Sequence, residues 1–302
     1  MINKVAVIGA GTMGNGIAHC FAQHGYPVQL IDVSAAQLEK AIQTISKNLD
    51  KQLAKGVITD EIKQKSLGLV KTNTSLEDGL REVDLVVEAA TENEELKKKI
   101  FRQLSELAPS NCILASNTSS ISITALAAVT NRPESVIGMH FMNPVPIMKL
   151  VEVINGYATS ASVTQTITRL SEDLAKVPCV VNDYPGFVSN RILMPMINEA
   201  IYTLYEGVAG VKEIDTVMKL GMAHPMGPLQ LADFIGLDVC LSILTVLETG
   251  FGNPKYAACP LLKDMVSAGK LGVKSGEGFY VYTTGSKDLV PSHRFQKESV
   301  NA

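Results

Sequence analysis

Two residues in the middle of the sequence could work together on a proton. His140 opens the run His-Phe-Met-Asn-Pro-Val-Pro, directly after an apolar stretch that predicts a β-strand. Glu152 lies inside a second apolar stretch, where an unpaired carboxylate would be costly to bury. A histidine on an adjacent strand would be a suitable partner, because a buried glutamate can set the tautomer of an imidazole and stabilise the imidazolium. The residues leave two alternatives open, a catalytic His–Glu pair and a purely structural one.

A glycine-rich turn near the N-terminus predicts a binding site for a dinucleotide. The turn consists of Gly9, Ala10, Gly11, Thr12, Met13 and Gly14, between a predicted strand and a predicted helix. In such a turn Gly9 permits the tight bend, Gly11 lets the backbone approach a pyrophosphate, and Gly14 lets helix and strand pack closely. The unpaired N–H groups of the helix N-terminus would hold the pyrophosphate.

Asp32 predicts which dinucleotide binds there. It stands at the end of the second predicted strand, about 20 residues after the glycine turn, where a carboxylate can bind the 2′-hydroxyl of the adenosine ribose. The same negative charge would repel a 2′-phosphate, so we expect NAD rather than NADP.

These residues need a parallel sheet to position them. The first half of the chain alternates short β-branched runs with helical patterns, which is typical of strands joined by crossover helices. We predict a doubly wound, mostly parallel Rossmann-type α/β domain over residues 1–184. Its expected strands are residues 5–8, 28–31, 69–71, 85–88, 112–115, 136–139, 149–153 and 179–181.

Residues 34–68 predict a helical hairpin inserted into this domain. Apolar residues recur at helical spacing after Ser34, the expected N-cap, and the first helix should close near Gly56. A second helix is expected over residues 59–67, ending at Gly68. The outer face of the hairpin carries Lys40, Lys47, Lys51 and Lys55. These lysines are either a solvated helix face or a dock for a phosphorylated ligand.

Further helices are expected along the rest of the chain. Asn93 should cap a helix with an apolar side formed by Leu96, Ile100, Leu104 and Leu107. Beyond residue 184 the strand signals fade, and an all-α second domain is predicted over residues 185–282. Its helical patterns cover residues 187–206, where Pro195 should cause a kink or a break, and residues 211–220, 228–248 and 260–269. The polar, aperiodic residues 283–302 predict a loose tail.

The composition argues against several classes of partner. The chain has 302 residues, 46% of them hydrophobic and 19% charged, with a net charge of −3. It lacks the basic surplus that a nucleic-acid backbone attracts, and no apolar run approaches the roughly 18–20 residues of a membrane span. The five cysteines form no C-x-x-C pair, and the histidines lack metal-ligand spacing, so no metal site is expected. With no secretory leader recognisable, we expect a cytoplasmic protein.

The chain resembles the L-3-hydroxyacyl-CoA dehydrogenases from residue 5 to about residue 282, most of all the free-standing bacterial enzymes of 3-hydroxybutyryl-CoA. The glycine turn and the histidine run both contribute to this resemblance. The other segments that carry it are residues 88–92 (Glu-Ala-Ala-Thr-Glu), 116–120 (Ser-Asn-Thr-Ser-Ser), 149–153, 185–187 (Pro-Gly-Phe), 190–191, 225–228 (Pro-Met-Gly-Pro), 233, 236–238 and 276–280 (Gly-Glu-Gly-Phe-Tyr).

The resemblance implies roles for individual residues. His140 matches the general base of the family and Glu152 the carboxylate that orients it, while Ser119 and Asn190 match positions that bond the substrate oxygen. The positions that match cofactor contacts are Gly9, Gly11, Thr12, Met13, Gly14, Asp32 at the adenosine ribose, and Glu92, Lys97 and Asn117 near the nicotinamide. Residues 34–68 correspond to the CoA-binding region and the helical domain to the dimer interface.

The implied activity is NAD-dependent oxidation of an (S)-3-hydroxyacyl-CoA to a 3-ketoacyl-CoA, and its reversal, by a homodimer in fatty-acid or butanoate metabolism. One alternative is a sugar-acid dehydrogenase of the gulonate type, although that branch has His-Pro where this chain has His140 and Phe141. The other is a catalytically silent NAD-binding protein. Competent residues at every matched catalytic position argue against it.

Overall fold

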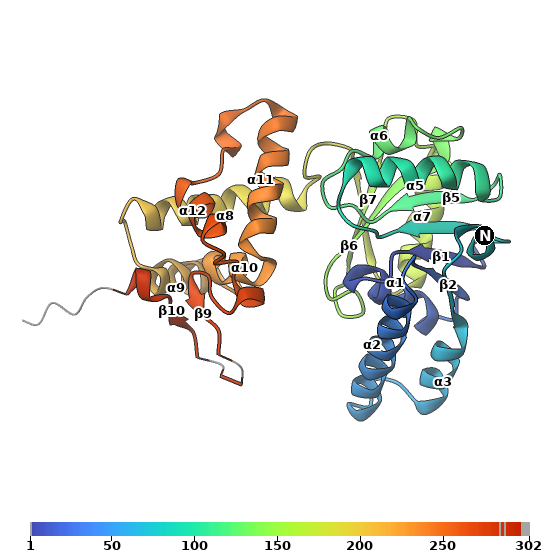
Figure 1. Cartoon of the computed structure of the whole chain (residues 1–302), viewed down its shortest axis with the longest axis horizontal. Coiled ribbons are helices and arrows are strands. Elements are labelled where there is room, and N and C mark those ends of the chain that lie inside the picture. The colour runs from blue at the N-terminus through green and yellow to red at the C-terminus, as the bar shows by residue number, and fades with distance from the viewer. Residues whose placement is uncertain (1, 284, 287, 297–302) are drawn as a thin grey trace, which may run out of the picture. The chain divides into compact units, whose positions relative to one another are not determined.

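The computed structural model describes residues 2–283, 285–286 and 288–296. The chain divides into two compact units, Met1–Phe187 and Val188–Ala302, each with an apolar core of its own. Figure 1 follows the chain through both by colour. The expected domain boundary, near residue 184, lies just before this division.

The first unit is built on an eight-stranded sheet with the order β3-β2-β1-β4-β5-β6-β7-β8. The strands are β1 (Val5–Ile8), β2 (Val28–Ile31), β3 (Val70–Asn73), β4 (Leu85–Glu88), β5 (Ile113–Ser116), β6 (Val136–Phe141), β7 (Leu150–Asn155) and β8 (Val177–Asn182). All neighbouring strands run parallel except β6 and β7, which are antiparallel. The doubly wound, mostly parallel sheet that the sequence predicts is therefore confirmed.

Helices cover both faces of the sheet. Side chains alternate between the two faces along each strand, and here both sets are apolar and must be buried. On β1, Val5 and Val7 pack with α1 (Thr12–Gln23), α2 (Ala35–Ala54) and α7 (Ala161–Asp173). The intervening Ala6 and Ile8 pack with helices of the opposite face. The helices on that face are α4 (Leu76–Gly79), α5 (Glu94–Leu107) and α6 (Ile123–Ala127).

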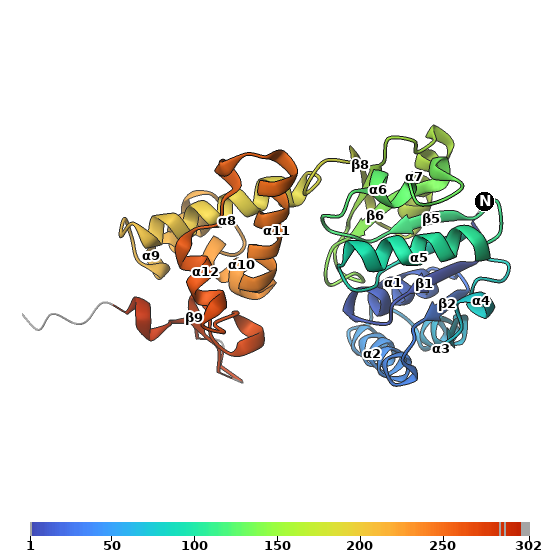
Figure 2. The ribbon, with the colours of Figure 1, turned by 45° about the horizontal axis from the view of Figure 1, so that its top comes forward.

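The helical hairpin is present, with one difference from its predicted bounds. The Ser34 hydroxyl accepts a hydrogen bond from the Gln37 N–H (3.3 Å), and α2 ends just before Gly56, which has a φ of 69°. The second helix, α3 (Asp60–Leu69), lies beside α2 in Figures 1 and 2. It passes through Gly68 instead of ending there, because Gly68 does not adopt the left-handed conformation that ends a helix.

Helix α5 begins as predicted, but only part of its predicted apolar side is buried. The Asn93 side chain accepts a hydrogen bond from the Leu96 N–H (2.9 Å) and caps the helix. However, the Leu96 side chain is 39% exposed and that of Leu107 is 42% exposed, whereas Lys97 and Phe101 are buried. The predicted apolar side is therefore confirmed only in part: Leu104 is buried and Ile100 packs against the core, whereas Leu96 and Leu107 are exposed and Lys97 turns inward to an acidic partner.

The second unit is helical. Its α-helices are α8 (Ser189–Tyr205), α9 (Val211–Gly221), α10 (Pro228–Ile235), α11 (Leu237–Phe251) and α12 (Pro260–Ser267). The predicted helix 228–248 is two helices, bent by 96° at Gly236, whose φ of 105° is not helical. Helix α8 continues through Pro195 without a break.

Part of the predicted loose tail is ordered. Strand β10 (Val290–Pro291) pairs antiparallel with β9 (Tyr280–Val281), and the ring of Phe295 lies 5.9 Å from that of Phe279. The prediction is wrong for these residues, because a two-residue strand and one aromatic side chain leave no periodic pattern. Residues 284, 287 and 297–302 lie outside the described part.

None of the described helices is by itself long and apolar enough to cross a membrane. The bent pair α10 and α11 passes a test of length and composition only when its two helices are taken together.

Candidate active site

The antiparallel pairing of β6 and β7 places His140 directly opposite Glu152. The imidazole Nδ1 lies 2.8 Å from the Glu152 Oε2, and the two residues are 8% and 2% exposed. The partner that the sequence required for the buried carboxylate is therefore the histidine. With Nδ1 bound to the carboxylate, Nε2 is the ring nitrogen that can exchange a proton with a ligand.

An aromatic side chain covers part of the imidazole. The Phe187 ring centre lies 6.1 Å from that of His140 at an interplanar angle of 56°, and the phenyl group is almost fully buried. This apolar neighbour limits access of water to the His–Glu pair, and an electrostatic interaction is stronger where water is excluded.

Glu92 organises the segment that contains Ser119. Its Oε1 accepts hydrogen bonds from the Thr118 hydroxyl (2.6 Å), the Ser119 N–H (2.8 Å) and the Ser119 hydroxyl (3.1 Å). Burial raises the pKa of Glu92, but the Lys97 ammonium and these donors outweigh it, so the net pKa is below its usual value. Glu92 therefore stays ionised and holds the serine-rich turn in place.

Sequence reasoning missed Glu88, which ends the fully buried strand β4. Its carboxylate accepts two hydrogen bonds from the Lys97 ammonium (2.7 and 2.9 Å) and one from the Ser116 hydroxyl (2.7 Å). Lys97 also lies 3.4 Å from Glu92. The ammonium thus links two carboxylates beneath the predicted site. The sequence did offer one signal for Glu88: it is an acidic residue at the end of an apolar strand, and a buried carboxylate must have a partner.

Asn117 ties the end of β5 to the end of β6. Its side-chain oxygen accepts a hydrogen bond from the Phe141 N–H (2.9 Å), and its own N–H donates to the Glu88 carbonyl (2.7 Å). It thereby supports the backbone immediately after His140.

The glycine turn fits a dinucleotide. A Cβ on Gly11 would meet open space, whereas one on Gly14 would lie 1.7 Å from the Gly9 carbonyl oxygen. Helix α1 begins at Thr12 without a side-chain cap or an acidic residue in its first turn, which leaves N–H groups for a phosphate. Asp32 and the turn line a cavity of about 570 Å³. The carboxylate also accepts a hydrogen bond from the Ala10 N–H (2.7 Å), which braces the turn.

A second cavity, of about 370 Å³, lies on the side of the glycine turn that faces α2. Gly11 and Thr12, the helix residues Lys40 and Thr44, and the loop residue Val145 all contribute to its wall. Of the four exposed lysines that the sequence singles out on the hairpin, Lys40 lines this cavity.

Two domain models of 3-hydroxyacyl-CoA dehydrogenases match the chain, the NAD-binding domain over residues 4–184 and the C-terminal domain over residues 186–282. The chain belongs to this family. It is 55% identical to a 3-hydroxybutyryl-CoA dehydrogenase of Bradyrhizobium diazoefficiens, over 93% of this chain and 96% of that protein. It is 52% identical to a probable 3-hydroxybutyryl-CoA dehydrogenase of Bacillus subtilis, over 93% and 98%. The crystal structure of (S)-3-hydroxybutyryl-CoA dehydrogenase from Ralstonia eutropha has a TM-score of 0.91 and 50% identity, and the match covers 94% of this chain and all of that one.

As an NAD-dependent 3-hydroxyacyl-CoA dehydrogenase, the chain brings most of its predicted site residues to one region of the first unit. His140 and Glu152 are in contact, Ser119 is bound to Glu92, and Lys97 and Asn117 support the same strand ends. Asn190 lies in the first turn of α8, in the second unit.

Among the described residues, no group of three or more His, Cys, Asp or Glu side chains could hold a metal ion.

Proposed function

We propose that the protein interconverts (S)-3-hydroxybutyryl-CoA and acetoacetyl-CoA, with His140 as general base and acid. The observation that carries the proposal is the 2.8 Å contact between the buried His140 and Glu152, at the carboxyl end of β6. Ligands of open α/β sheets bind beyond this edge. The names of the relatives reported above support the choice of a four-carbon acyl group.

In this proposal each residue of the chain has one task. His140 takes the proton of the 3-hydroxyl on Nε2, and Glu152 stabilises the resulting imidazolium from Nδ1. The Ser119 hydroxyl and the Asn190 side chain bond the substrate oxygen, where one donor contributes about 3–4 kcal/mol to the stability of a developing alkoxide. NAD, held by the glycine turn and Asp32, supplies the hydride acceptor. In the reducing direction His140 returns the proton.

The CoA portion of the substrate has a suitable place at the second cavity. Lys40 supplies positive charge there, and Thr44 and Asn48 supply polar groups, all from the hairpin helix α2. We therefore propose that the hairpin binds the phosphorylated end of CoA. The lysines that do not line this cavity, Lys47, Lys51 and Lys55, are solvated in this proposal.

The proposal is tested by following NADH oxidation with acetoacetyl-CoA. His140→Ala should lower kcat by about 10²- to 10⁴-fold, the usual contribution of general acid–base catalysis. Glu152→Gln should lower kcat with little change in the affinity for NADH, because Glu152 binds the imidazole that transfers the proton. The control is Glu106→Gln, an exposed glutamate on α5, which should leave kcat unchanged.

The same assay separates the alternatives. Turnover of gulonate with NAD, without turnover of acetoacetyl-CoA, would indicate a sugar-acid dehydrogenase. Tight NADH binding without turnover of any acyl-CoA would indicate a silent NAD-binding protein. If His140→Ala retained most of the wild-type kcat, the assignment of the base would be wrong.

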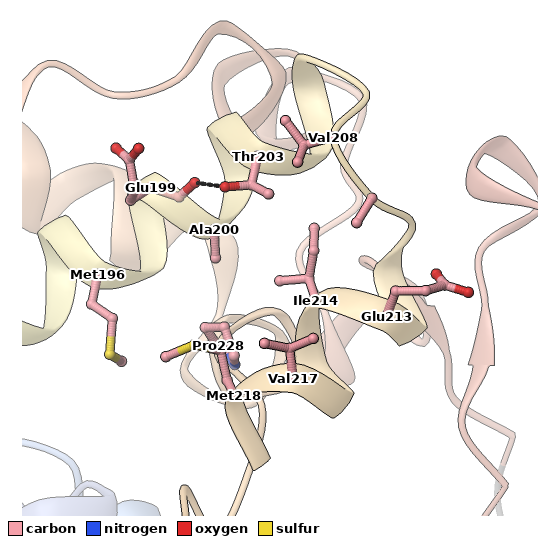
Figure 3. Close-up of a pocket in the computed structure, with 11 residues that line it drawn as sticks. Met196, Glu199, Ala200, Thr203, Val208, Glu213, Ile214, Val217, Met218 and Pro228 are labelled. Atoms are coloured by element: carbon pink, nitrogen blue, oxygen red, sulfur yellow. Dashed lines mark hydrogen bonds between the residues drawn. The ribbon is translucent and has the colours of Figure 1, made fainter. Parts of the chain in front are cut away.

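We also propose that the protein is a cytoplasmic homodimer formed through the second unit. An apolar groove of about 430 Å³ lies between α8 and α9, and Figure 3 shows Met196, Ile214 and Met218 around it. Val208 and Val217, which line the groove, are 72% and 61% exposed, and a contiguous apolar surface of this kind is typical of a protein–protein interface. Val217→Asp should convert a dimer into a monomer in sedimentation, whereas Lys212→Asp, at an exposed charged position of α9, should not.

A further inference from the structure

A buried lysine outside the proposed catalytic set holds the loop between the two catalytic strands. Lys176 is 8% exposed and lies between α7 and β8. Its ammonium donates hydrogen bonds to the carbonyl oxygens of Val145 (2.6 Å) and Met148 (2.8 Å). Both carbonyls belong to the loop that leads from β6, which carries His140, to β7, which carries Glu152.

The backbone on both sides of Lys176 is fixed, so its side chain has a defined origin. Ala175 adopts a left-handed φ of 54°, and the Lys176 N–H donates to the Ser171 carbonyl (2.9 Å), which closes the end of α7. The next residue, Val177, donates its N–H to the Lys149 carbonyl (2.7 Å) and begins β8. Lys176 therefore stands at a rigid junction beside the loop it binds.

The loop has few bonds of its own. Within it, the N–H groups of Ile147 and Met148 both donate to the Pro144 carbonyl at 3.0 Å. The Lys176 ammonium adds a bond to each side of this turn. Without it, the Val145 and Met148 carbonyls would lose a strong, charge-assisted donor.

The same loop connects the His–Glu pair to the nucleotide-binding helix. Val145 is 2% exposed, and a Cβ on Gly16 of α1 would lie only 3.0 Å from the Val145 Cβ. Val145 also lines the cavity that contains Gly11 and Thr12 of the glycine turn. A shift of the loop would thus move a wall of the proposed substrate cavity relative to His140.

The chemistry of Lys176 favours a positioning role over simple packing. Among the described residues its ammonium makes no salt bridge with a carboxylate, so its charge is solvated by the two loop carbonyls together with the Cys20 thiol of α1. An apolar side chain of similar length would fill the same space without the cost of burying a charge. What the ammonium adds is a directed contact between α1, through Cys20, and the two carbonyl oxygens of the loop.

We propose that Lys176 is a positioning residue for the proton transfer at His140. Its ammonium clamps the β6–β7 loop and thereby sets the place of the imidazole relative to the glycine turn and the substrate cavity. This proposal rests on the proposed role of His140.

The experiment compares Lys176→Met, Lys176→Arg and the control Lys71→Met, an exposed lysine on β3, well below their unfolding temperatures. We expect Lys176→Met to lower kcat for acetoacetyl-CoA by about 10- to 10²-fold, the effect of a small misplacement of a reacting group. The affinity for NADH should stay close to that of the wild type. The kinetic isotope effect with NADH dideuterated at C4 should rise, because the chemical step becomes more rate-limiting. Lys176→Arg, which keeps the charge and the donors, should recover part of the lost kcat.

A merely structural lysine would lower the unfolding temperature without changing kcat or the isotope effect of the folded enzyme, and that result would overturn the proposal. Equal losses in Lys176→Met and Lys71→Met would do so as well. If Lys176→Met is not recovered folded, Lys176→Gln, which retains a polar end, replaces it in the same comparison. Failure of the His140 assignment is distinguished by His140→Ala, which would then retain turnover whatever the Lys176 variants do.

Discussion

Glu88 and Lys97 illustrate how a single pair of charges supports the site. Both side chains are essentially inaccessible to water, at 0% and 1% exposure, and their bonds link β4 to α5 beneath Glu92 and Ser119. A buried pair of this kind adds little stability in itself, because desolvation offsets most of the attraction. Loss of one partner, however, leaves the other charge buried alone.

We therefore predict that Lys97→Met lowers the free energy of unfolding by about 3–5 kcal/mol. Urea denaturation measures this loss. Lys99→Met, at an exposed position of the same helix, should change it far less. The double variant Glu88→Gln/Lys97→Met should regain part of the loss, because the buried negative charge is gone. Equal stabilities of the single and double variants would contradict this account.

Asp233 gives the second unit a dependence on pH. Its carboxylate accepts hydrogen bonds from the N–H groups of Phe279 and Tyr280, both at 2.9 Å, and from the Tyr282 hydroxyl. Burial nevertheless raises the pKa of Asp233 to about 6, above the roughly 3.9 of an unfolded chain. The folded state therefore binds a proton more tightly than the unfolded state between these two values.

This difference in proton affinity decides whether stability rises or falls with pH. From about pH 4 to pH 6, Asp233 should lower the free energy of unfolding of the second unit as the pH rises, by about 2–3 kcal/mol in all. Chemical denaturation at several pH values checks this. Asp233→Asn should remove this contribution, so the stability difference between wild type and variant should change across the same window. A difference independent of pH would show that the carboxylate does not titrate there.

At the scale of the elements, the sequence predicts what depends on local chemistry. The caps Ser34 and Asn93, and the place of the glycine turn between β1 and α1, agree with the sequence-based prediction, because each depends on residues within a few positions. The His140–Glu152 contact was also anticipated, since a buried carboxylate needs a partner. The inward turn of Lys97 is not predicted, because the sequence does not show which of the cations near Glu88 is its partner.

The break at Gly236 and the ordered segment after residue 283 also depend on more than the residues nearby in the sequence. A glycine within a helical pattern is tolerated or ends the helix according to its backbone conformation, and Gly68 and Gly236 behave in opposite ways. The contact of Phe295 with Phe279 is set by tertiary packing, which no short window of sequence contains.

Removal of residues 284–302 should therefore destabilise the second unit. The truncation deletes β10, the Ser292 N–H bond to the Phe279 carbonyl (2.9 Å) and the Phe295 ring, and it exposes Phe279. We expect a loss of about 3 kcal/mol or more, comparable to the deletion of one large aromatic side chain from a core. Asp288→Asn, at an exposed position of the same segment, is the control and should leave the unfolding midpoint unchanged. Equal midpoints for the truncation and for Asp288→Asn would show that the segment does not support the core.

At the scale of the whole molecule, the two units have separate cores and separate tasks in the proposed function. The glycine turn, Asp32 and the surrounding cavity all belong to the first unit. A ligand that binds only the folded state stabilises it by about 2.7 kcal/mol at a concentration of 100 times its Kd. We expect NADH to give this stabilisation to the first unit.

Hydrogen exchange read by mass spectrometry can measure the effect in each unit separately. At 100 times the Kd of NADH, amides of β1 and β4 that exchange only through global unfolding of the first unit should slow by about 10²-fold. Amides in the core of the second unit, such as those of α11, should change much less. Asp32→Ala should reduce the protection at the same NADH concentration, since it removes the carboxylate that lines the cavity and braces the glycine turn. Equal protection of α11 and β1 would show instead that the two units unfold as one cooperative body, with the nucleotide stabilising both.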